Sequence, residues 1–281
     1  MDYPFYINDF DRVKDHKLVY PSVSKIFEHP VSFWFGERNG RGTCNLDKRL
    51  KRFFKRTDPY LPIMVIYNIP DRDMGHHSKG GAKYTEDYLN FCDEISKQIG
   101  DREVILIYEP DALPHSTLMD EEAMQWRHGL MRQGLKIITR NCAAKVYVDI
   151  GHSNWLDPEQ AGKMLDAVYV DGCRGFSVNV SNFRTTKESM SWAKRVSEHA
   201  KLKHFVIDTS RNGNGPYGNE WCNPPGRALG EAPTTNTGEE QCDAFLWIKI
   251  PGESDGKANG GPRAGKFWPE YADELVKNTN G

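Results

Sequence analysis

One stretch of the chain, IPDRDMGHHSKGGA at residues 69–82, concentrates side chains that can do chemistry. It contains two aspartates, an arginine, two adjacent histidines and a Gly-Gly pair. These residue types suit a metal site, a phosphate-binding loop or a pair of carboxylates for acid–base catalysis. The three possibilities predict different classes of protein, and the spacing of the residues discriminates among them.

The spacing argues against the first two possibilities. His76 and His77 are neighbours, so both cannot easily point at one ion, and the chain lacks the HExxH, HxH and paired-cysteine patterns of zinc sites. The segment SKGGAK matches neither GxxxxGK[ST] nor GxGxxG, the two common phosphate loops. We therefore expect no metal and no cofactor, and carboxylate chemistry remains.

Polar side chains recur at the ends of successive apolar runs. They are Asp71, Arg72 and Asp73, then Glu109 and Asp111, then Asp149, His152 and Trp155, then Asn179 and Asn182, then Asp208 and Arg211, then Lys249, Glu253 and Asp255. A single Asp or Asn at such a place is usually a turn former or a helix cap. Six successive runs that end in this way favour a shared site, because the carboxyl ends of parallel strands meet at one mouth.

The apolar runs themselves predict the sheet that positions these residues. Seven runs rich in β-branched and aromatic residues occupy residues 31–35, 63–68, 103–109, 144–150, 175–180, 204–209 and 244–249. Most are continuous rather than alternating, as expected for strands buried on both faces. Their centres lie about 30 to 40 residues apart, which leaves room for a strand and a crossover helix.

Several of the intervening segments have helical periodicity. One begins at Thr85, predicted as its N-cap, and stops at Gly100; another begins at the Asp157–Pro158 pair; a third covers residues 185–200. Strand and helix that alternate through the chain predict an α/β fold with a closed, TIM-barrel-like (β/α) barrel. Two Gly/Pro-rich stretches, residues 211–238 and 251–265, are interpreted as functional loops, and no low-complexity linker divides the chain.

Composition limits the classes of partner and the cellular location that the sequence predicts. The 281 residues are 38% hydrophobic and carry a net charge of −2, which allows a sizeable core and argues against a nucleic-acid partner. No run of 18 apolar residues exists, so no membrane span is predicted. The N-terminus, MDYPFYINDF, lacks the basic and apolar regions of a signal peptide. Six cysteines without a metal spacing do not fix the compartment, and we expect a monomer.

The surplus of carboxylates is accompanied by Trp34, Trp155 and Trp221 near other strand ends or loops. Hydrolysis of a glycosidic bond needs this combination. One carboxylic acid protonates the leaving oxygen, a second carboxylate assists water, and flat rings stack on sugar faces.

Seven ordered motifs then resemble those of glycoside hydrolase family 6, the inverting cellulases. They are YNIPDRD, YEPDAL, VDIGHSNW, VNVSNF, IDTSRNGNGP, EWCNPPGRALG and FLWIKIPGESDG, which together extend from about residue 31 to the C-terminus. The resemblance implies a distorted seven-stranded parallel (β/α) barrel, with residues 1–281 as a single catalytic domain. It also implies a β-1,4-glucan as the polysaccharide substrate and secretion from the cell.

The resemblance assigns roles at the reaction centre. It implies that Asp111 is the general acid and that Asp73 is the neighbour that keeps this acid protonated and stabilises the cationic transition state. Two close carboxylates cannot both ionise easily, which agrees with this division. It implies that Asp255 is the proposed general base, although an inverting enzyme can also pass the proton along a chain of waters. Tyr67 resembles the tyrosine that distorts the sugar at the cleavage point.

The resemblance also implies a set of substrate-binding residues. Arg72 resembles a residue that pairs with the catalytic carboxylates, His152 a structural or substrate-binding residue, and Trp155 a platform on the leaving-group side. The residues that grip sugar on the non-reducing side are matched by Trp34, Asn182, Trp221, Lys249 and Glu253.

Three positions depart from the family pattern. Met74 and Lys257 stand where the family often has cysteine, so Cys222 is expected to lack its usual disulfide partner. Lys79 occupies the place of a serine that holds the catalytic water, and the adjacent Ser78 is a candidate substitute.

The segments after Asp111 and Asp255 are too short to roof a cleft, which favours internal cleavage by an endoglucanase. The alternatives are an exo-acting cellobiohydrolase of the same family and a catalytically weakened sugar-binding protein. The latter would keep its tryptophans and lose its carboxylates, whereas Asp73, Asp111 and Asp255 are all present.

Overall fold

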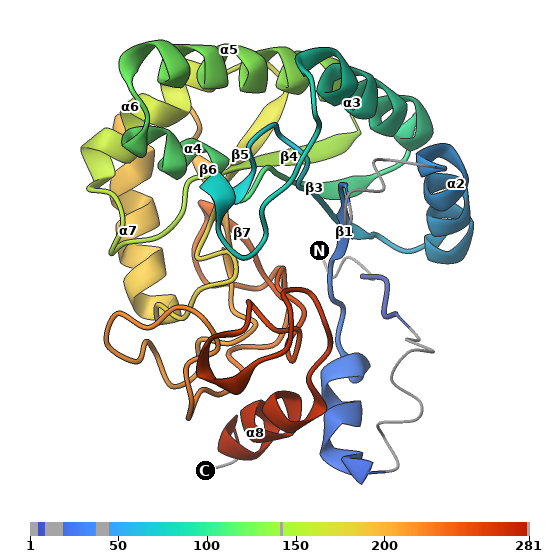
Figure 1. The fold of residues 1–281 in the computed structure, drawn as a ribbon, viewed down its shortest axis with the longest axis vertical. Helices are drawn as coiled ribbons and strands as arrows, with labels where there is room; N and C mark the ends of the chain where they lie inside the picture. Colours follow the sequence, from blue (N-terminus) through green and yellow to red (C-terminus); the bar gives the residue numbers. More distant parts are fainter. Residues whose placement is uncertain (1–4, 9–18, 38–44, 141–142, 280–281) are drawn as a thin grey trace.

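The computed structural model describes residues 5–8, 19–37, 45–140 and 143–279. Its centre is one parallel sheet whose seven strands neighbour one another in sequence order (Figure 1). The strands are β1 (Phe33–Phe35), β2 (Ile63–Ile66), β3 (Val104–Tyr108), β4 (Ala144–Asp149), β5 (Cys173–Val178), β6 (His204–Asp208) and β7 (Cys242–Leu246). Each predicted apolar run therefore contains or overlaps a strand.

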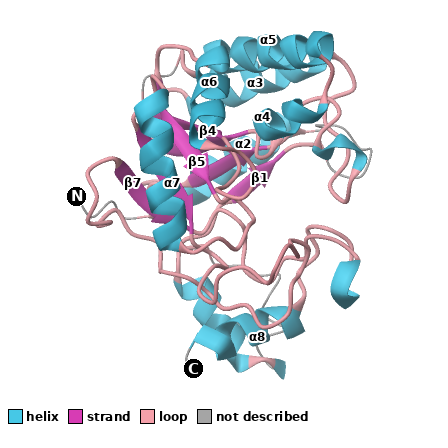
Figure 2. Cartoon of the chain, turned by 90° about the vertical axis from the view of Figure 1, so that its left-hand side faces the viewer, coloured by secondary structure: helices cyan, strands magenta, loops and turns pink. Residues whose placement is uncertain are grey.

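Helices follow most strands and cover the outer face of the sheet (Figures 1 and 2). The longer ones are α2 (Leu46–Thr57), α3 (Thr85–Ile99), α5 (Glu121–Ile138), α6 (Pro158–Val168), α7 (Thr186–His199) and α8 (Pro269–Thr279). Short helical turns complete the description: η2 (Pro21–Glu28), η3 (Asp73–Gly75), α4 (Ala112–His115), η4 (Ser116–Leu118) and η5 (Ala258–Gly260).

Side chains cap α5, α6 and α7, whereas α2, α3 and α4 begin without a side-chain cap bond. Asp157 caps α6 by accepting a hydrogen bond from the Gln160 backbone N at 3.0 Å, as its sequence predicts. The predicted cap of α3 is wrong: Thr85 is the first helical residue, and Tyr84 precedes it without a side-chain cap. That helix ends before Gly100 as expected, where φ is +55° and a side chain would be strained.

The sheet is curled, but its two edge strands do not join in a regular ladder within the described residues. Backbone and side-chain bonds connect the flanks of β1 and β7 instead: Ser32 N donates to Trp247 O at 3.2 Å, and Trp34 Nε1 donates to Ile248 O at 3.0 Å. Residues 247 and 248 lie beyond the end of β7, so only the chain past the strand reaches β1. The predicted closed barrel is thus a distorted, incompletely closed one.

The strand–helix alternation fails once. Residues 209–241 connect β6 to β7 without a helix, so the Gly/Pro-rich stretch is a long loop, as its composition indicates. The loop is fixed at its base, because Gly230 N donates to Thr209 O and Thr234 pairs with Phe245 of β7. It therefore lies against the carboxyl ends of two strands, where it can build a binding site.

Alternate strand residues fill two cores. Ile63, Val65 and Ile107 point inward and form a cluster inside the curled sheet, whereas Met64 and Leu106 point outward beneath the helices. Trp34 and Tyr67 pack on the inner cluster at the end that lies near the carboxyl ends of the strands. The floor of the mouth is thus an apolar core that holds these two rings in place.

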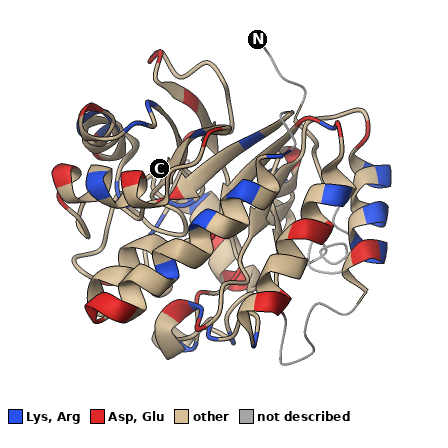
Figure 3. Ribbon diagram, turned by 90° about the horizontal axis from the view of Figure 1, so that it is seen from above, with Lys and Arg blue, Asp and Glu red and all other residues tan. Residues whose placement is uncertain are grey.

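The surface carries charges of both signs on the outer helices, interspersed in the view of Figure 3. Among the described residues, no helix is long and apolar enough to cross a membrane. Cys92, Cys173, Cys222 and Cys242 are free thiols, which agrees with the expected loss of the Cys222 disulfide. Cys44 and Cys142 lie outside the described residues.

Candidate active site

The carboxyl ends of the strands open into a cavity of about 2500 Å³. All fourteen residues predicted for the site line it, although they come from loops that follow six different strands or from β1 itself. They are Trp34, Tyr67, Arg72, Asp73, Ser78, Lys79, Asp111, His152, Trp155, Asn182, Trp221, Lys249, Glu253 and Asp255.

Asp111 stands directly after β3 with its carboxyl available to a substrate. Its backbone is left-handed (φ +66°) and its N–H donates to Asp149 Oδ2 at 2.8 Å. It occupies the N-cap position of the short α4 but makes no side-chain cap bond. Burial, followed by the charges of Asp149, Asp73 and Asp255, raises its pKa well above that of an ordinary aspartate. The raised pKa favours the protonated form of this carboxyl, which is the form that a general acid needs.

Two buried carboxyl groups hold the surrounding backbone. Glu109 accepts hydrogen bonds from Asn68 N at 2.9 Å and Ile69 N at 3.1 Å, and burial raises its pKa to about 7. Asp149 accepts from the N–H groups of Asp111 and Gly151, and burial raises its pKa to about 7 as well. Glu109 thus fixes the start of the 69–82 loop, whereas Asp149 orients the acid.

Asp73 lies in a tightly folded loop with an unusual backbone. Asp71, Asp73 and Met74 all have positive φ values of 44–60°, a conformation that is rare outside glycine and collects at functional sites. The fold is secured because Asp73 Oδ2 accepts from Ser78 N at 2.6 Å and Arg72 N donates to Gly80 O at 3.1 Å. The Asp73 carboxylate is therefore fixed beside Asp111.

Arg72 does not form the expected ion pair with the catalytic carboxylates. Its side chain is buried and donates to the backbone carbonyls of Ser78 at 2.8 Å and Tyr67 at 2.6 Å. The guanidinium also lies 4.6 Å from the centre of the Tyr67 ring. One of these carbonyls follows β2 and the other lies in the loop, so Arg72 connects Tyr67 to the loop.

The adjacent histidines contact different walls of the cavity. The His76 ring stacks on His115 with centroids 6.5 Å apart, whereas the His77 ring lies 5.7 Å from that of Trp221. His77 also packs on Gly256, where a Cβ atom would lie 2.5 Å from the imidazole. The pair therefore connects the loop after β2 to both sides of the mouth. Among the described residues, no group of three or more potential ligands could hold a metal ion.

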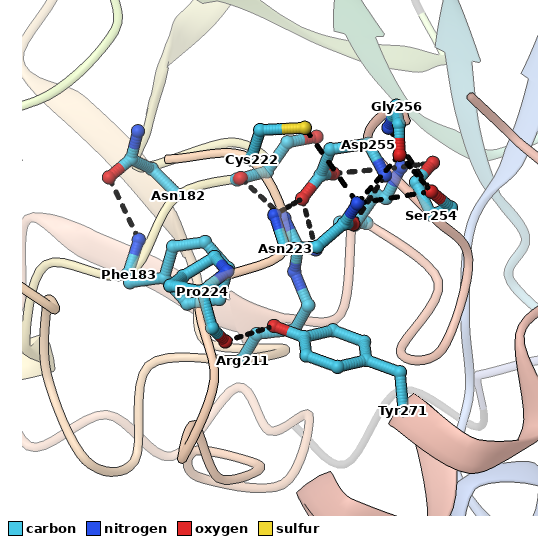
Figure 4. A network of polar contacts seen from close by, with 12 residues as sticks. Asn182, Phe183, Arg211, Cys222, Asn223, Pro224, Ser254, Asp255, Gly256 and Tyr271 are labelled. Atoms are coloured by element: carbon cyan, nitrogen blue, oxygen red, sulfur yellow. Dashed lines mark hydrogen bonds and ion pairs between the residues drawn. The ribbon is translucent and has the colours of Figure 1, made fainter. Parts of the chain in front are cut away.

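Asp255 occupies the opposite electrostatic environment to Asp111. Its carboxylate accepts from Arg211 Nη1 at 2.8 Å and from Asn223 N at 3.1 Å (Figure 4). Lys249 Nζ lies 3.3 Å from its other oxygen. Burial alone would raise its pKa, but Arg211 and Lys249 outweigh burial and hold the pKa below the ordinary value. Neighbouring carboxyls with opposite shifts are the arrangement that separates an acid from an ionised partner.

Flat aromatic rings surround these carboxyls. Trp34 meets the Tyr67 ring edge-on at 5.4 Å, and the Tyr67 hydroxyl has a pKa well above 10 because of burial and the charges of Asp111 and Asp73. Trp155 contacts His115 at 4.9 Å on another wall. Trp221 is 47% exposed, so its face is open to a ligand. These rings line the same cavity as the acid and offer flat surfaces on which sugars can stack.

The remaining predicted residues are less constrained. His152 lies beside Trp155 with a ring distance of 5.6 Å, and burial lowers its pKa to about 4, so it is neutral at neutral pH. Asn182 uses its Oδ1 to accept from Phe183 N at 2.9 Å. Lys79 is exposed at the rim, whereas the Ser78 backbone is tied to Asp73.

Several lining or supporting residues were not assigned a catalytic or binding role from the sequence, although Arg211 was expected at the mouth of the strands. His115 follows the acid by four residues on α4, and Trp126 is an exposed ring on α5 that lines the same cavity. Arg211 and Asn223 hold Asp255 from the loop between β6 and β7. The motifs SRNGNG and EWCN contain the last two, but no periodicity links them to Asp255 before the loops fold together.

A parallel barrel whose cleft is lined by tryptophans and holds one carboxyl of raised pKa and one of lowered pKa is typical of proteins that cleave glycosidic bonds. Comparison with known sequences gives the family. The model of the glycosyl hydrolases family 6 matches residues 9–279. The chain belongs to this family, in agreement with its motifs.

Two curated relatives and one solved structure document the similarity. Endoglucanase A of Cellulomonas fimi is 43% identical over 258 residues, which cover 91% of this chain and 56% of the relative. Endoglucanase A of Thermobispora bispora is 43% identical over 78% of this chain and 48% of the relative. The chain thus spans about half the length of these two proteins.

The solved structure is that of the endoglucanase Cel6 from Mycobacterium tuberculosis, in complex with methyl-cellobiosyl-4-deoxy-4-thio-β-D-cellobioside. It superposes with a TM-score of 0.93 at 36% identity and covers 99% of this chain and 98% of that chain.

Proposed function

We propose that this protein hydrolyses internal β-1,4-glucosidic bonds in cellulose or related β-glucans, with inversion at the anomeric carbon. The observation that carries the proposal is the pair of opposed carboxyls: Asp111 has a raised pKa and a free carboxyl, and Asp255 is ionised between two cations. They follow separate strands, β3 and β7, and both line the cavity, as required of an enzyme that holds a water between its base and the sugar.

In the proposed reaction, the Asp111 carboxyl donates its proton to the glycosidic oxygen as the C1–O bond breaks. A water attacks C1 from the opposite face and forms the new C1–O bond, and its proton passes to Asp255 directly or through a second water. Asp73 stabilises the positive charge that develops on the sugar ring, and Tyr67 presses on the ring that must distort. The ion pairs with Arg211 at 2.8 Å and Lys249 at 3.3 Å make Asp255 a weak base, so we expect proton transfer to be easier when these contacts lengthen.

Internal cleavage is supported by how the two segments around the mouth fold. The segment after Asp255 returns to its own base, because Ser254 N donates to Lys266 O at 3.0 Å and Trp268 N donates to Gly252 O at 2.7 Å. The segment after Asp111 is occupied by α4 and η4 before α5 begins at Glu121. Neither segment has free length to extend over a bound chain.

The names of the relatives agree with this proposal. The two curated relatives are called endoglucanases, and the solved neighbour is an endoglucanase bound to a thio-linked cello-oligosaccharide. One contact favours the exo-acting alternative: His77 reaches Trp221 and Gly256 and so narrows the mouth at one point. This bridge is a single exposed side chain rather than a peptide loop.

Viscometry separates the two modes of cleavage. On a soluble cellulose derivative, we expect viscosity to fall far faster than reducing ends accumulate, because each cut in mid-chain shortens the polymer strongly. The measurement is specific viscosity plotted against reducing sugar during the first few per cent of hydrolysis. Parallel change of both signals, with cellobiose as nearly the sole early product, would establish the exo-acting alternative.

A further inference from the structure

Two segments that are distant in sequence meet beside Asp255, and no disulfide joins them. Figure 4 shows residues 222–224 of the β6–β7 loop against residues 254–256 after β7. Cys222 is a buried free thiol, and Lys257 stands on the facing segment. Asn259 Nδ2 donates to Cys222 O at 2.9 Å and ties the outer edge of this junction.

Asn223 lies at the centre of the junction. It is 1% exposed and has a left-handed backbone (φ +51°), which asparagine tolerates better than most residues. Its backbone N donates to Asp255 Oδ2 at 3.1 Å, and its Oδ1 accepts from Asp255 N at 2.8 Å. The same residue thus contacts both the carboxylate and the main chain of Asp255.

The amide nitrogen of Asn223 has a separate task. Nδ2 donates to Gly256 O at 2.8 Å and lies 3.2 Å from both Ser254 Oγ and Ala258 O. These acceptors surround Asp255 on either side in sequence. A side chain that satisfies these three acceptors fixes the turn that carries the carboxylate. Arg211 and Lys249 bind the carboxylate oxygens, and Lys249 adds one longer bond to this turn, from Nζ to Ser254 O at 3.4 Å.

We propose that Asn223 is a positioning residue that holds the Asp255 carboxylate in register with the reaction centre. Its hydrogen bonds connect the β6–β7 loop to the segment after β7 without a covalent bond, and we call this connection the latch. The inference rests on the proposed function, because it assigns Asn223 to a reaction in which Asp255 takes part. Catalysis is sensitive to such placement, since an error of about 1 Å can cost about 10²-fold in rate.

The test is Asn223→Ala, assayed on soluble cellulose. We expect kcat to fall about 10- to 100-fold, in line with a misplaced group, while KM changes little because the stacking rings are untouched. The acid limb of kcat/KM should move to higher pH, because a loosened Asp255 pairs less well with its cations. The charged and titratable groups that face Asp255 are Arg211, Lys249, Asp111, Cys222 and Tyr271.

The matched control is Asn278→Ala. Asn278 Nδ2 donates to Arg227 O at 2.9 Å and ties α8 to the same long loop without contact to Asp255. This variant should keep the wild-type kcat and pH profile. Equal losses of kcat in both variants would mean that Asn223 has only a structural role, and this result would overturn the proposal. If Asn223→Ala fails to fold, Asn259→Ala provides the test: a two- to threefold fall in kcat supports the latch, and an unchanged kcat contradicts it.

A disulfide between the two loops can replace the contacts that Asn223 makes and provides a second test. Adding Lys257→Cys to Asn223→Ala places a thiol opposite Cys222, and oxidation should restore most of the lost kcat, reversibly with reductant. A disulfide confirmed by mass spectrometry without recovery of kcat would overturn the proposal. A wild-type protein that hydrolyses no glucan would instead refute the proposed function, so the two failures are distinguishable.

Discussion

Replacement of the general acid should separate substrates by their leaving group. In Asp111→Ala, we expect hydrolysis of unactivated β-glucan to fall by about 10²–10⁴-fold, the usual contribution of general acid catalysis. An aryl cello-oligosaccharide whose phenol leaves without a proton should lose far less. The physical reason is the raised pKa of Asp111, which keeps its proton available, and initial rates on both substrates measure the difference.

Asp157→Ala is the matched control for this prediction. Both aspartates occupy N-cap positions, but only Asp157 uses its carboxylate as a cap. The control should lose about 1 kcal/mol of stability and none of its activity. Equal losses by Asp111→Ala on the activated and unactivated substrates would contradict the general-acid assignment. The wild-type rate should fall as pH rises through the raised pKa of Asp111, because the ionised form has no proton to donate.

Asp255→Asn should affect both stability and rate. The substitution leaves Arg211, which is fully buried, and Lys249 without their anion. Loss of one partner of a buried ion pair costs about 3–5 kcal/mol, so we expect the melting temperature to fall by roughly 6 °C or more. Assayed at a temperature where the variant is folded, kcat should fall at least about 10²-fold, as for loss of a general base.

The sign of the pH effect on stability follows from the lowered pKa of Asp255. In the wild type, its ionised form stabilises the fold above the ordinary aspartate pKa of about 3.9, and this contribution is lost as pH falls through the folded-state pKa. Asp255→Asn should lack this component of acid denaturation. Melting curves of both proteins from about pH 2 to pH 5 measure it, because the contribution changes between the lowered folded-state pKa and the ordinary pKa.

Asp243→Asn is the control for an ion pair that plays no part in the reaction. Asp243 pairs with Arg174 at 2.7 Å and accepts from Tyr147 at 2.7 Å near the start of β7, at the other end of the sheet. This substitution should lower stability and leave kcat unchanged. A wild-type kcat in folded Asp255→Asn would remove Asp255 from the mechanism.

The sheet could be predicted from the sequence because buried parallel strands are continuous apolar runs. IMVI and VILIY are strands β2 and β3, and both are fully buried. Closure of the barrel could not be predicted in the same way. It depends on how Ser32 meets Trp247, more than 200 residues away, and no local pattern encodes that distance. The missing helix between β6 and β7 was visible only as a Gly/Pro-rich composition.

The site could be predicted in outline for a related reason. Parallel strands direct their carboxyl ends to one mouth, so Asp111 and Asp255 meet although 144 positions separate them. The partners of Arg72 were missed because they are the backbone carbonyls of Tyr67 and Ser78, and sequence spacing does not report the direction of a carbonyl. Asn223 was missed because its role exists only after two loops fold together.

The stereochemistry of the first product tests the central claim most directly. Proton NMR during early turnover of a cello-oligosaccharide resolves the anomeric signals before mutarotation mixes them. Because the attacking water lies on the face opposite the leaving group, we predict that the α-anomer of the new reducing end accumulates first. Early accumulation of the β-anomer would contradict the account, since it requires a covalent intermediate on a carboxylate rather than direct attack by water.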